Sequence, residues 1–351
     1  MNTVTPESIA LFCLTPGGVA LAKRLQGMLP VTCFTSERLV CEGFRPFTGS
    51  FAQTVRDAFS VYSALIVIGA TGLTVRVMAP LLRDKMTDPA VVVIDERAQH
   101  VISLISGHLG GANALTRYLA GMLGADPVIT TATDVNGLAA LDVLACALDA
   151  DMDDMRGAVK TVNQMLVSQQ RVGLWWDNSL RGTFPPCDTT GFIDVDSLGA
   201  LPDLDALVCV SLQDTLPDLP LPVFKLVPRR VVAGIGCRRE TDFPLLKALL
   251  DVQFRANHFD PLALRAIGSI ALKKDEPALQ QLARSRRVPF EVFSAQHLRE
   301  HESRFPCSAF VRQTTGVGCV SQPVAWIMSQ GRLVGDTLRQ QGVTITLGVS
   351  H

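Results

Sequence analysis

The chain has 351 residues and a formal net charge of −1, with 32 basic and 33 acidic residues. A chain of this length exceeds what a single hydrophobic core supports, so two or three domains are expected. The composition is 48% hydrophobic and only 19% charged, which excludes intrinsic disorder, because disordered chains are poor in apolar residues. Near-neutral charge and 6% aromatic residues also argue against nucleic-acid or membrane-surface partners.

The nine cysteines are scattered through the chain, and no two of them have CxxC spacing. This pattern indicates neither a structural zinc site nor a disulfide framework, so we expect no metal site and reduced thiols in the cytoplasm. Glu7 precedes the apolar stretch 9–14, where a signal peptide would have a basic start. The most apolar stretch, residues 61–82, contains a glycine turn and Arg76. It therefore predicts a strand, a turn and a helix rather than a membrane span.

Five apolar runs in the first 140 residues predict buried strands. These runs are residues 9–14, 64–68, 91–94, 101–105 and 128–131. Helical patterns and glycine-rich turns alternate with them, which is typical of a parallel, Rossmann-like α/β sheet with right-handed crossovers. We place this N-terminal domain at residues 1–139. Ligands of such sheets bind beyond the carboxyl ends of the strands.

The pattern changes near residue 140, where aspartates punctuate a helical pattern that continues through Met165. Residues 185–222 are rich in Pro and Asp. This composition predicts a small middle domain, residues 140–227, that ends in a linker near residues 217–225.

A second α/β unit then begins and predicts a C-terminal domain over residues 228–351. Helical patterns start near Phe243, Pro277 and Gln322. The expected strands are residues 231–235, 267–272, 290–293, 333–334 and 343–349.

Four familiar motifs are missing from the chain: GxGxxG, GxxxxGK[ST], GxSxG and HExxH. Their absence removes the usual sequence support for dinucleotide redox chemistry, P-loop phosphoryl transfer, a serine nucleophile elbow and a zincin-type zinc site.

The strongest local feature is the segment 106–113, in which His108 lies among glycines at a predicted strand-to-helix turn. Backbone N–H groups at Gly110 and Gly111 could meet an anion there, and an imidazole pKa near 6.5 suits proton transfer. The alternative is a tight turn whose histidine caps or packs locally. Asp95 and Glu96 follow another predicted strand and could orient His108 or activate water. They could equally form an ordinary solvated loop.

Two further turns of the N-terminal domain could bind a ligand. Gly69, Thr71 and Gly72 offer backbone donors, and Arg76 offers a cation. Alternatively, this segment is only a crossover turn. Thr131 and Asp134 follow the last predicted strand of this domain, and they either bind a ligand or cap the next helix.

The C-terminal unit has basic side chains after two of its predicted strands. Arg238 and Arg239 follow a glycine turn, and Lys273 ends the next strand. Because guanidinium groups suit carboxylates, two basic pairs after two strands of one sheet, Arg238-Arg239 and Lys273-Lys274, favour anion binding over the alternative of a solvated surface.

These segments closely resemble the cobalt-precorrin-5A hydrolase family (CbiG-like) of cobalamin biosynthesis. In the N-terminal domain, the matching segments are residues 69–76, 79–82, 88–96, 106–113 and 128–134. The C-terminal half resembles the family's second characteristic domain, which also occurs alone as a CobE-like module. Its matching segments are residues 236–239, 269–273, 276–277 and 315–318. Two departures are Gln322-Pro323, where the family often has Glu-Pro, and a missing lysine around residues 333–342.

The resemblance implies an enzyme that opens the δ-lactone of cobalt-precorrin-5A and releases acetaldehyde, giving cobalt-precorrin-5B on the anaerobic route to vitamin B12. It implies no cofactor, since the cobalt belongs to the corrinoid substrate. The acetate and propionate groups of that substrate suit Arg76, Arg238, Arg239 and Lys273.

Our working mechanism makes His108, held by Asp95 or Glu96, the base that activates water. The amides of Gly110 and Gly111, with Asn113, would stabilise the oxyanion.

An alternative from another class is a non-catalytic corrinoid carrier, which the lone occurrence of the CobE-like module keeps open. A tetrapyrrole methyltransferase is disfavoured, because no glycine-rich site for a methyl donor is visible. A homodimer, or transient contact with other enzymes of the pathway, is also left open.

Overall fold

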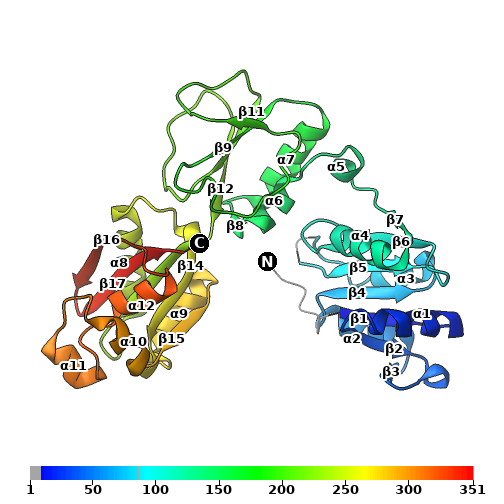
Figure 1. The fold of residues 1–351 in the computed structure, drawn as a ribbon, viewed down its shortest axis with the longest axis horizontal. Coiled ribbons are helices and arrows are strands. Elements are labelled where there is room, and N and C mark those ends of the chain that lie inside the picture. Colours follow the sequence, from blue (N-terminus) through cyan, green and yellow to red (C-terminus); the bar gives the residue numbers. More distant parts are fainter. Residues whose placement is uncertain (1–8, 86, 351) are drawn as a thin grey trace. The chain divides into compact units, whose positions relative to one another are not determined.

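The computed structural model describes residues 9–85 and 87–350 (Figure 1). These residues divide into two compact units, one that ends at Cys146 and one that begins at Ala147. The described residues form a seven-stranded sheet in the first unit and two five-stranded sheets in the second. Helices alternate with strands in the first and the third of these sheets, whereas α7 is the one described helix between strands of the middle sheet. The predicted α/β fold class, with an N-terminal, a middle and a C-terminal part, is therefore confirmed. None of the described helices combines the length and the apolar character needed to cross a bilayer.

The first sheet has the strand order β3-β2-β1-β4-β5-β6-β7. Its strands are β1 Ile9–Cys13, β2 Thr32–Thr35, β3 Phe44–Pro46, β4 Ala64–Ile68, β5 Ala90–Ile94, β6 His100–Ile105 and β7 Asp126–Val128. The helices of this unit are α1 Pro16–Gln26, η2 Glu37–Leu39, α2 Phe51–Phe59, α3 Thr71–Met78, α4 Ala112–Leu123, α5 Ala132–Val135 and α6 Leu141–Ala147. Every residue of β1, β4 and β5 is buried, because apolar side chains pack on both faces of a sheet covered by helices.

We expected a parallel sheet, but one pair of neighbouring strands in this sheet is antiparallel. β6 pairs antiparallel with β5 and parallel with β7. Only residues 95–99 join β5 to β6, and a connection this short allows a hairpin but not the crossover that a parallel pair requires. The carboxyl end of β6 therefore lies at the edge of the sheet opposite to the carboxyl end of β5.

The middle sheet has the order β10-β9-β11-β12-β8. Its elements are β8 Ala150–Asp151, α7 Met155–Val167, β9 Val172–Trp176, β10 Ile193–Val195, β11 Ala206–Val210 and β12 Val223–Pro228. The single helix expected through Met165 is interrupted by β8, where Asp149 has a left-handed φ of 48°. β12 overlaps the linker that we expected near residues 217–225. Only Arg229 and Arg230 lie between the end of β12 and the start of the next strand, at Val231.

The C-terminal sheet has the order β15-β14-β13-β17-β16. Its strands are β13 Val231–Gly236, β14 Leu264–Ile270, β15 Phe290–Phe293, β16 Leu333–Gln340 and β17 Val343–Val349. Its helices are α8 Phe243–Ala256, η3 Pro261–Ala263, η4 Ala271–Lys273, α9 Pro277–Arg286, α10 Ala295–Glu302, α11 Ala309–Thr315 and α12 Ser321–Met328. β13, β14 and β15 are parallel, whereas β17 and β16 pair antiparallel.

The packing of α12 against β13 depends on a glycine. A Cβ atom at Gly234 would lie 2.1 Å from the Ser321 carbonyl oxygen and 2.6 Å from the Ala325 amide nitrogen. Both neighbours are backbone atoms of the helix segment, so they cannot rotate away. We expect Gly234→Ala to lower the free energy of unfolding by about 1–3 kcal/mol, as overpacking does in other cores.

Urea unfolding of the full chain measures this effect, and Gly121→Ala is the matched control. Gly121 lies in α4, and a Cβ atom there meets nothing within 4 Å. The control should be neutral or gain up to about 1 kcal/mol, because alanine favours a helix over glycine. Equal stabilities for the Gly234 variant and the unmodified chain would show that α12 can shift away from the sheet.

Candidate active site

A turn of irregular backbone carries His108 between β6 and α4. Ser106 and Gly111 both have left-handed φ values, 58° and 85°. The Ala112 amide donates to the Ser106 carbonyl oxygen at 3.1 Å, and the Asn113 amide donates to the Gly107 carbonyl oxygen at 2.9 Å. These bonds close the turn at the start of α4 and define the backbone from which the imidazole projects.

The His108 ring lies between two carboxylates. Its Nδ1 is 3.0 Å from Asp142 Oδ2, and its Nε2 is 3.0 Å from Asp134 Oδ2. The Thr133 hydroxyl lies 3.2 Å from the same Nε2. Side-chain exposure is 16% for His108, 15% for Asp134 and 5% for Asp142. The Nδ1 side is therefore the buried side, and Nε2 is on the more accessible side.

Asp134 is the centre of a larger polar network. Its carboxylate accepts hydrogen bonds from the Thr131 hydroxyl at 2.6 Å, from Asn113 Nδ2 at 2.9 Å and from Arg117. Burial alone raises the pKa of Asp134, but the bonds from Thr131, Arg117 and His108 lower it to about 2. Asp134 is consequently a carboxylate at every physiological pH.

The carboxylates change the acidity of the imidazole. The hydrogen bond with Asp142 raises the pKa of His108 above its ordinary value, against the opposing effect of burial, and Asp134 raises it further. Both carboxylates stabilise the charged imidazolium, because opposite charges nearby favour the ionised form. His108 thus holds its proton to a higher pH than a free histidine does, and in the protonated ring both nitrogens are donors to the two carboxylates.

We expect Asp142→Asn to lower the pKa of His108, because the interaction with the Asp142 carboxylate contributes most to the raised pKa and is then lost. The test is a pH titration of the ¹⁵N-labelled imidazole by NMR, in which the midpoint of the unmodified chain lies above 6.5. Asp126→Asn, which removes an exposed carboxylate of the same sheet, is the control and should leave the His108 midpoint unchanged. An unchanged midpoint for His108 in the Asp142→Asn protein would contradict the assignment of Asp142 as its main partner.

Asp95 and Glu96 do not hold His108, contrary to our sequence-based mechanism. They follow β5, whereas His108 follows β6, and the antiparallel pairing of these strands places them at opposite edges of the sheet. Asp95 instead accepts hydrogen bonds from the Arg97 and His100 amides in the turn between the strands. Burial alone raises the pKa of Asp95, but these backbone bonds outweigh burial and lower it.

Two of the predicted oxyanion donors, the Gly111 amide and the Asn113 side chain, have other partners. The Gly111 amide donates to the His108 carbonyl oxygen at 2.9 Å. Asn113 uses its Nδ2 for Thr131 and Asp134, and its Oδ1 accepts from the Ser103 hydroxyl at 2.6 Å. Gly110 packs closely, because a Cβ atom there would lie 2.3 Å from the Ser106 Cβ. Asn113 therefore positions the Asp134 carboxylate, which is a different role from the one predicted.

The other predicted residues of this unit lie around the carboxyl ends of β4 and β5. The Gly69 amide donates to the Ile94 carbonyl oxygen at 3.0 Å. Thr71 begins α3, and Gly72 and Arg76 are exposed on that helix. The structure thus separates this predicted group from the His108 group, since β6 and β7 end at the opposite edge.

The C-terminal basic residues differ in exposure. Arg238 and Arg239 are exposed after β13. Lys273 is buried, and its Nζ donates to Glu276 Oε2 at 2.7 Å. A lysine held by a buried carboxylate is not available to a substrate carboxylate unless that pair opens.

Sequence reasoning missed Asp142, Thr133 and Arg117 as members of the His108 group. Asp142 is 34 positions from His108, and no motif links the two. Thr133 and Arg117 lie within or beside segments that we had singled out, but their roles depend on contacts across the turn.

The structure is that of a multidomain α/β protein in which a histidine lies between two carboxylates at one edge of the N-terminal sheet. Three family models match successive parts of the chain: Cobalamin synthesis G N-terminal over residues 53–134, Cobalamin biosynthesis central region over 139–224, and Cobalamin synthesis G C-terminus over 231–348. The chain is 70% identical to the cobalt-precorrin-5A hydrolase of Salmonella typhimurium over 351 residues, which is 100% of both chains.

A second relative, the cobalt-precorrin-5A hydrolase of Priestia megaterium, is 30% identical over 88% of this chain and 84% of its own length. This chain belongs to the cobalt-precorrin-5A hydrolase family, which confirms the resemblance seen in the sequence. Among solved structures, a cobalamin biosynthesis protein G homologue from Sulfolobus solfataricus aligns over 98% of this chain and 97% of its own, with 18% identity and a TM-score of 0.39. CobE aligns over 35% of this chain and 91% of its own, with 29% identity and a TM-score of 0.33.

Proposed function

We propose that this protein is a cobalt-precorrin-5A hydrolase that opens the δ-lactone of its corrinoid substrate and releases acetaldehyde in anaerobic cobalamin biosynthesis. The observation that carries this proposal is the 70% identity, over the full length of both chains, to a cobalt-precorrin-5A hydrolase. The names of two such relatives favour hydrolysis over the alternative of a non-catalytic carrier.

We place the chemistry at His108 and assign it the role of proton donor. The sequence-based mechanism used a neutral imidazole as the base, but both ring nitrogens face carboxylates and the pKa of His108 is raised. An imidazolium in this setting is suited to give a proton rather than to take one. Asp142 holds Nδ1 on the buried side, as the aspartate does in a Ser-His-Asp triad, and leaves Nε2 to face the substrate.

The proposed reaction has two steps, lactone opening and then loss of acetaldehyde. In the second step the bond between the hydroxyl-bearing carbon and the macrocycle breaks, the hydroxyl oxygen becomes the aldehyde oxygen, its proton goes to water, and the electron pair stays on the macrocycle. The first step balances as follows. Water adds to the lactone carbonyl carbon, the ring C–O bond breaks, and the leaving alkoxide takes the proton from His108 Nε2. The proton lost by the attacking water then restores the imidazolium. Asn113, Thr131 and Arg117 hold Asp134 in place while Nε2 exchanges its carboxylate partner for the substrate oxygen.

Exposed Arg76, Arg238 and Arg239 remain the proposed partners of the acetate and propionate groups of the substrate, because free guanidinium groups bind carboxylates bidentately. All nine cysteines, each within the described residues, are free thiols, which supports the proposed cytoplasmic location. A homodimer stays a prediction, which sedimentation of the purified chain can test. Transient contacts with other pathway enzymes also stay a prediction, and they require sedimentation of the chain mixed with those enzymes.

The decisive experiment supplies the purified protein with cobalt-precorrin-5A and measures acetaldehyde together with loss of the lactone. Hydrolysis predicts stoichiometric acetaldehyde over many turnovers. Tight binding of the corrinoid with no acetaldehyde would overturn the proposal and favour the carrier.

A further inference from the structure

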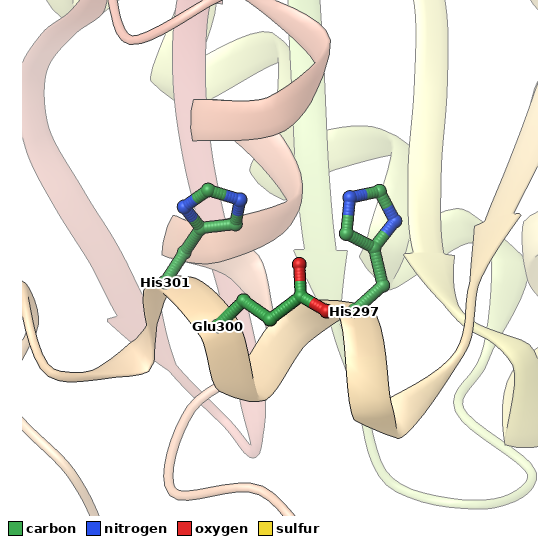
Figure 2. Close-up of side chains that lie close together, drawn as sticks. All are labelled: His297, Glu300 and His301. Atoms are coloured by element: carbon green, nitrogen blue, oxygen red, sulfur yellow. The ribbon is translucent and has the colours of Figure 1, made fainter.

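A group of metal-ligating side chains lies on α10, in the second unit, and plays no part in the proposed hydrolysis. The Nδ1 or Nε2 atoms of His297 and His301 and a carboxylate oxygen of Glu300 all lie within 4.8 Å of one another. Figure 2 shows both rings projecting from the same side of the helix, with the Glu300 carboxylate between them. Residues four apart in a helix lie on one face, one turn above the other, which explains this juxtaposition.

The three side chains are accessible to an ion. His297 and Glu300 are exposed and His301 is half-buried. The ring contacts of His297 are with Phe293, at 5.9 Å between centroids, and with His301, at 6.0 Å. Within residues 9–85 and 87–350, neither imidazole and no Glu300 oxygen is engaged in a side-chain hydrogen bond or an ion pair. Their lone pairs are therefore available for coordination.

The carboxylate of Glu302, two residues after Glu300 on α10, has protein partners that Glu300 lacks among the described residues. Glu302 accepts the Gly318 amide at 2.7 Å and pairs with Arg312 at 2.9 Å. The backbone hydrogen bond from Gly318 is the main cause of the lowered pKa of Glu302. Both carboxylate oxygens of Glu302 are thus engaged by protein groups, whereas those of Glu300 are available to an external ligand.

α10 is held in place by a capping hydrogen bond at its first turn and by a buried face. The Ser294 hydroxyl accepts the His297 amide at 3.2 Å and caps the first turn. Leu298, on another face of the helix, is fully buried in a cluster with Val317, Val320 and other apolar residues. Ligands held on a packed helix keep their geometry better than ligands on a loop.

We propose that His297, Glu300 and His301 form an exchangeable site for a divalent transition-metal ion such as Zn²⁺ or Co²⁺. Two imidazole nitrogens and one carboxylate oxygen suit these ions, whereas Mg²⁺ and Ca²⁺ prefer oxygen-only sets. Three protein ligands leave at least one position for water, as in open zinc sites. The order His-x-x-Glu-His also occurs in zinc peptidases, but here the carboxylate lies close enough to both imidazoles to be the third ligand itself.

Titration of the corrinoid-free full chain with Co²⁺, followed by its visible absorption, tests the site. We expect saturable binding, weakened at least about tenfold by His297→Ala or His301→Ala, since even the loss of an outer-shell partner costs about 10–100-fold in metal affinity. Glu300→Gln should also weaken binding, because the anionic oxygen is lost. His100→Ala, which removes an exposed histidine of the other unit, is the matched control and should bind normally.

A second measurement uses Zn²⁺ and thermal unfolding. A bound ion stabilises the folded state by mass action, so Zn²⁺ should raise the unfolding midpoint of the unmodified chain but not that of the His297→Ala, His301→Ala double variant. Because none of these side chains belongs to the buried core, the variants should fold normally, which circular dichroism checks. Absence of saturable Co²⁺ binding below millimolar concentrations, or equal affinity in the double variant, would overturn the proposal.

Discussion

His108→Gln should reduce the rate of acetaldehyde release from cobalt-precorrin-5A by about 10²–10⁴-fold, the range expected when one general acid or base is removed. Glutamine preserves hydrogen bonding in the space of the ring, but it carries no transferable proton at neutral pH. The effect should fall on kcat rather than on KM, because His108 is proposed to act on the leaving oxygen. Steady-state assays of acetaldehyde measure both constants.

His100→Gln is the matched control, since His100 belongs to the same sheet but is 54% exposed in its side chain and lies 3.7 Å from Asp126. It should retain full activity. Circular dichroism and urea unfolding establish that the His108 variant is folded. A folded His108→Gln protein with near-normal kcat would remove His108 from the mechanism while leaving the family assignment intact.

The pH dependence of kcat gives an independent check on the direction of proton transfer. If His108 acts as an acid, activity is lost as the pH rises through its pKa. Asp142→Asn lowers that pKa, so the alkaline limb of the profile should move to lower pH, together with the NMR midpoint. A base would lose activity on the acid side instead.

The second large effect is expected at the buried ion pair of the C-terminal unit. Glu276→Gln should lower the free energy of unfolding by about 3–5 kcal/mol, the usual cost of removing one partner of a buried pair. The side chains of Lys273 and Glu276 are only 11% and 7% exposed. Without the carboxylate, the Lys273 ammonium is left in the interior with no counter-charge. Urea unfolding of the full chain measures the loss.

The double variant Lys273→Met, Glu276→Leu separates charge from packing. Replacing both partners of a buried pair by apolar groups is often neutral or stabilising, so this protein should be about as stable as the unmodified chain. If Glu276→Gln instead costs less than about 1 kcal/mol, as exposed pairs do, then Lys273 reaches solvent. It would then be available to the substrate, as the sequence had suggested.

Much of the fold was predictable from local patterns. The apolar runs at β1, β4, β5 and β13 predicted strands, because burial on both faces of a covered sheet favours apolar side chains along the whole strand. By contrast, β2 and β3 were missed, since Thr32–Thr35 and Phe44–Pro46 are short and carry polar residues. β7 was expected at residues 128–131 but occupies Asp126–Val128.

The candidate site was only partly predictable. His108 was found because glycines mark the turn that exposes it, and such turns are local. Its carboxylate partners were chosen wrongly, because the choice depended on the direction of β6. The ligand group on α10 was visible in principle as a pair of histidines four residues apart, a spacing that we had examined only within HExxH.

The amino-acid sequence by itself determined the α/β class, the order of most strands and helices, the family and the position of His108 at a turn, since these depend on hydrophobic periodicity and residue identity over short distances. Only the tertiary structure decided which charges meet. The antiparallel course of β6 brings His108 to Asp134 and Asp142 and away from Asp95 and Glu96, and packing buries Lys273 against Glu276. These pairings depend on strand direction and burial, which are properties of the whole sheet and not of any one segment.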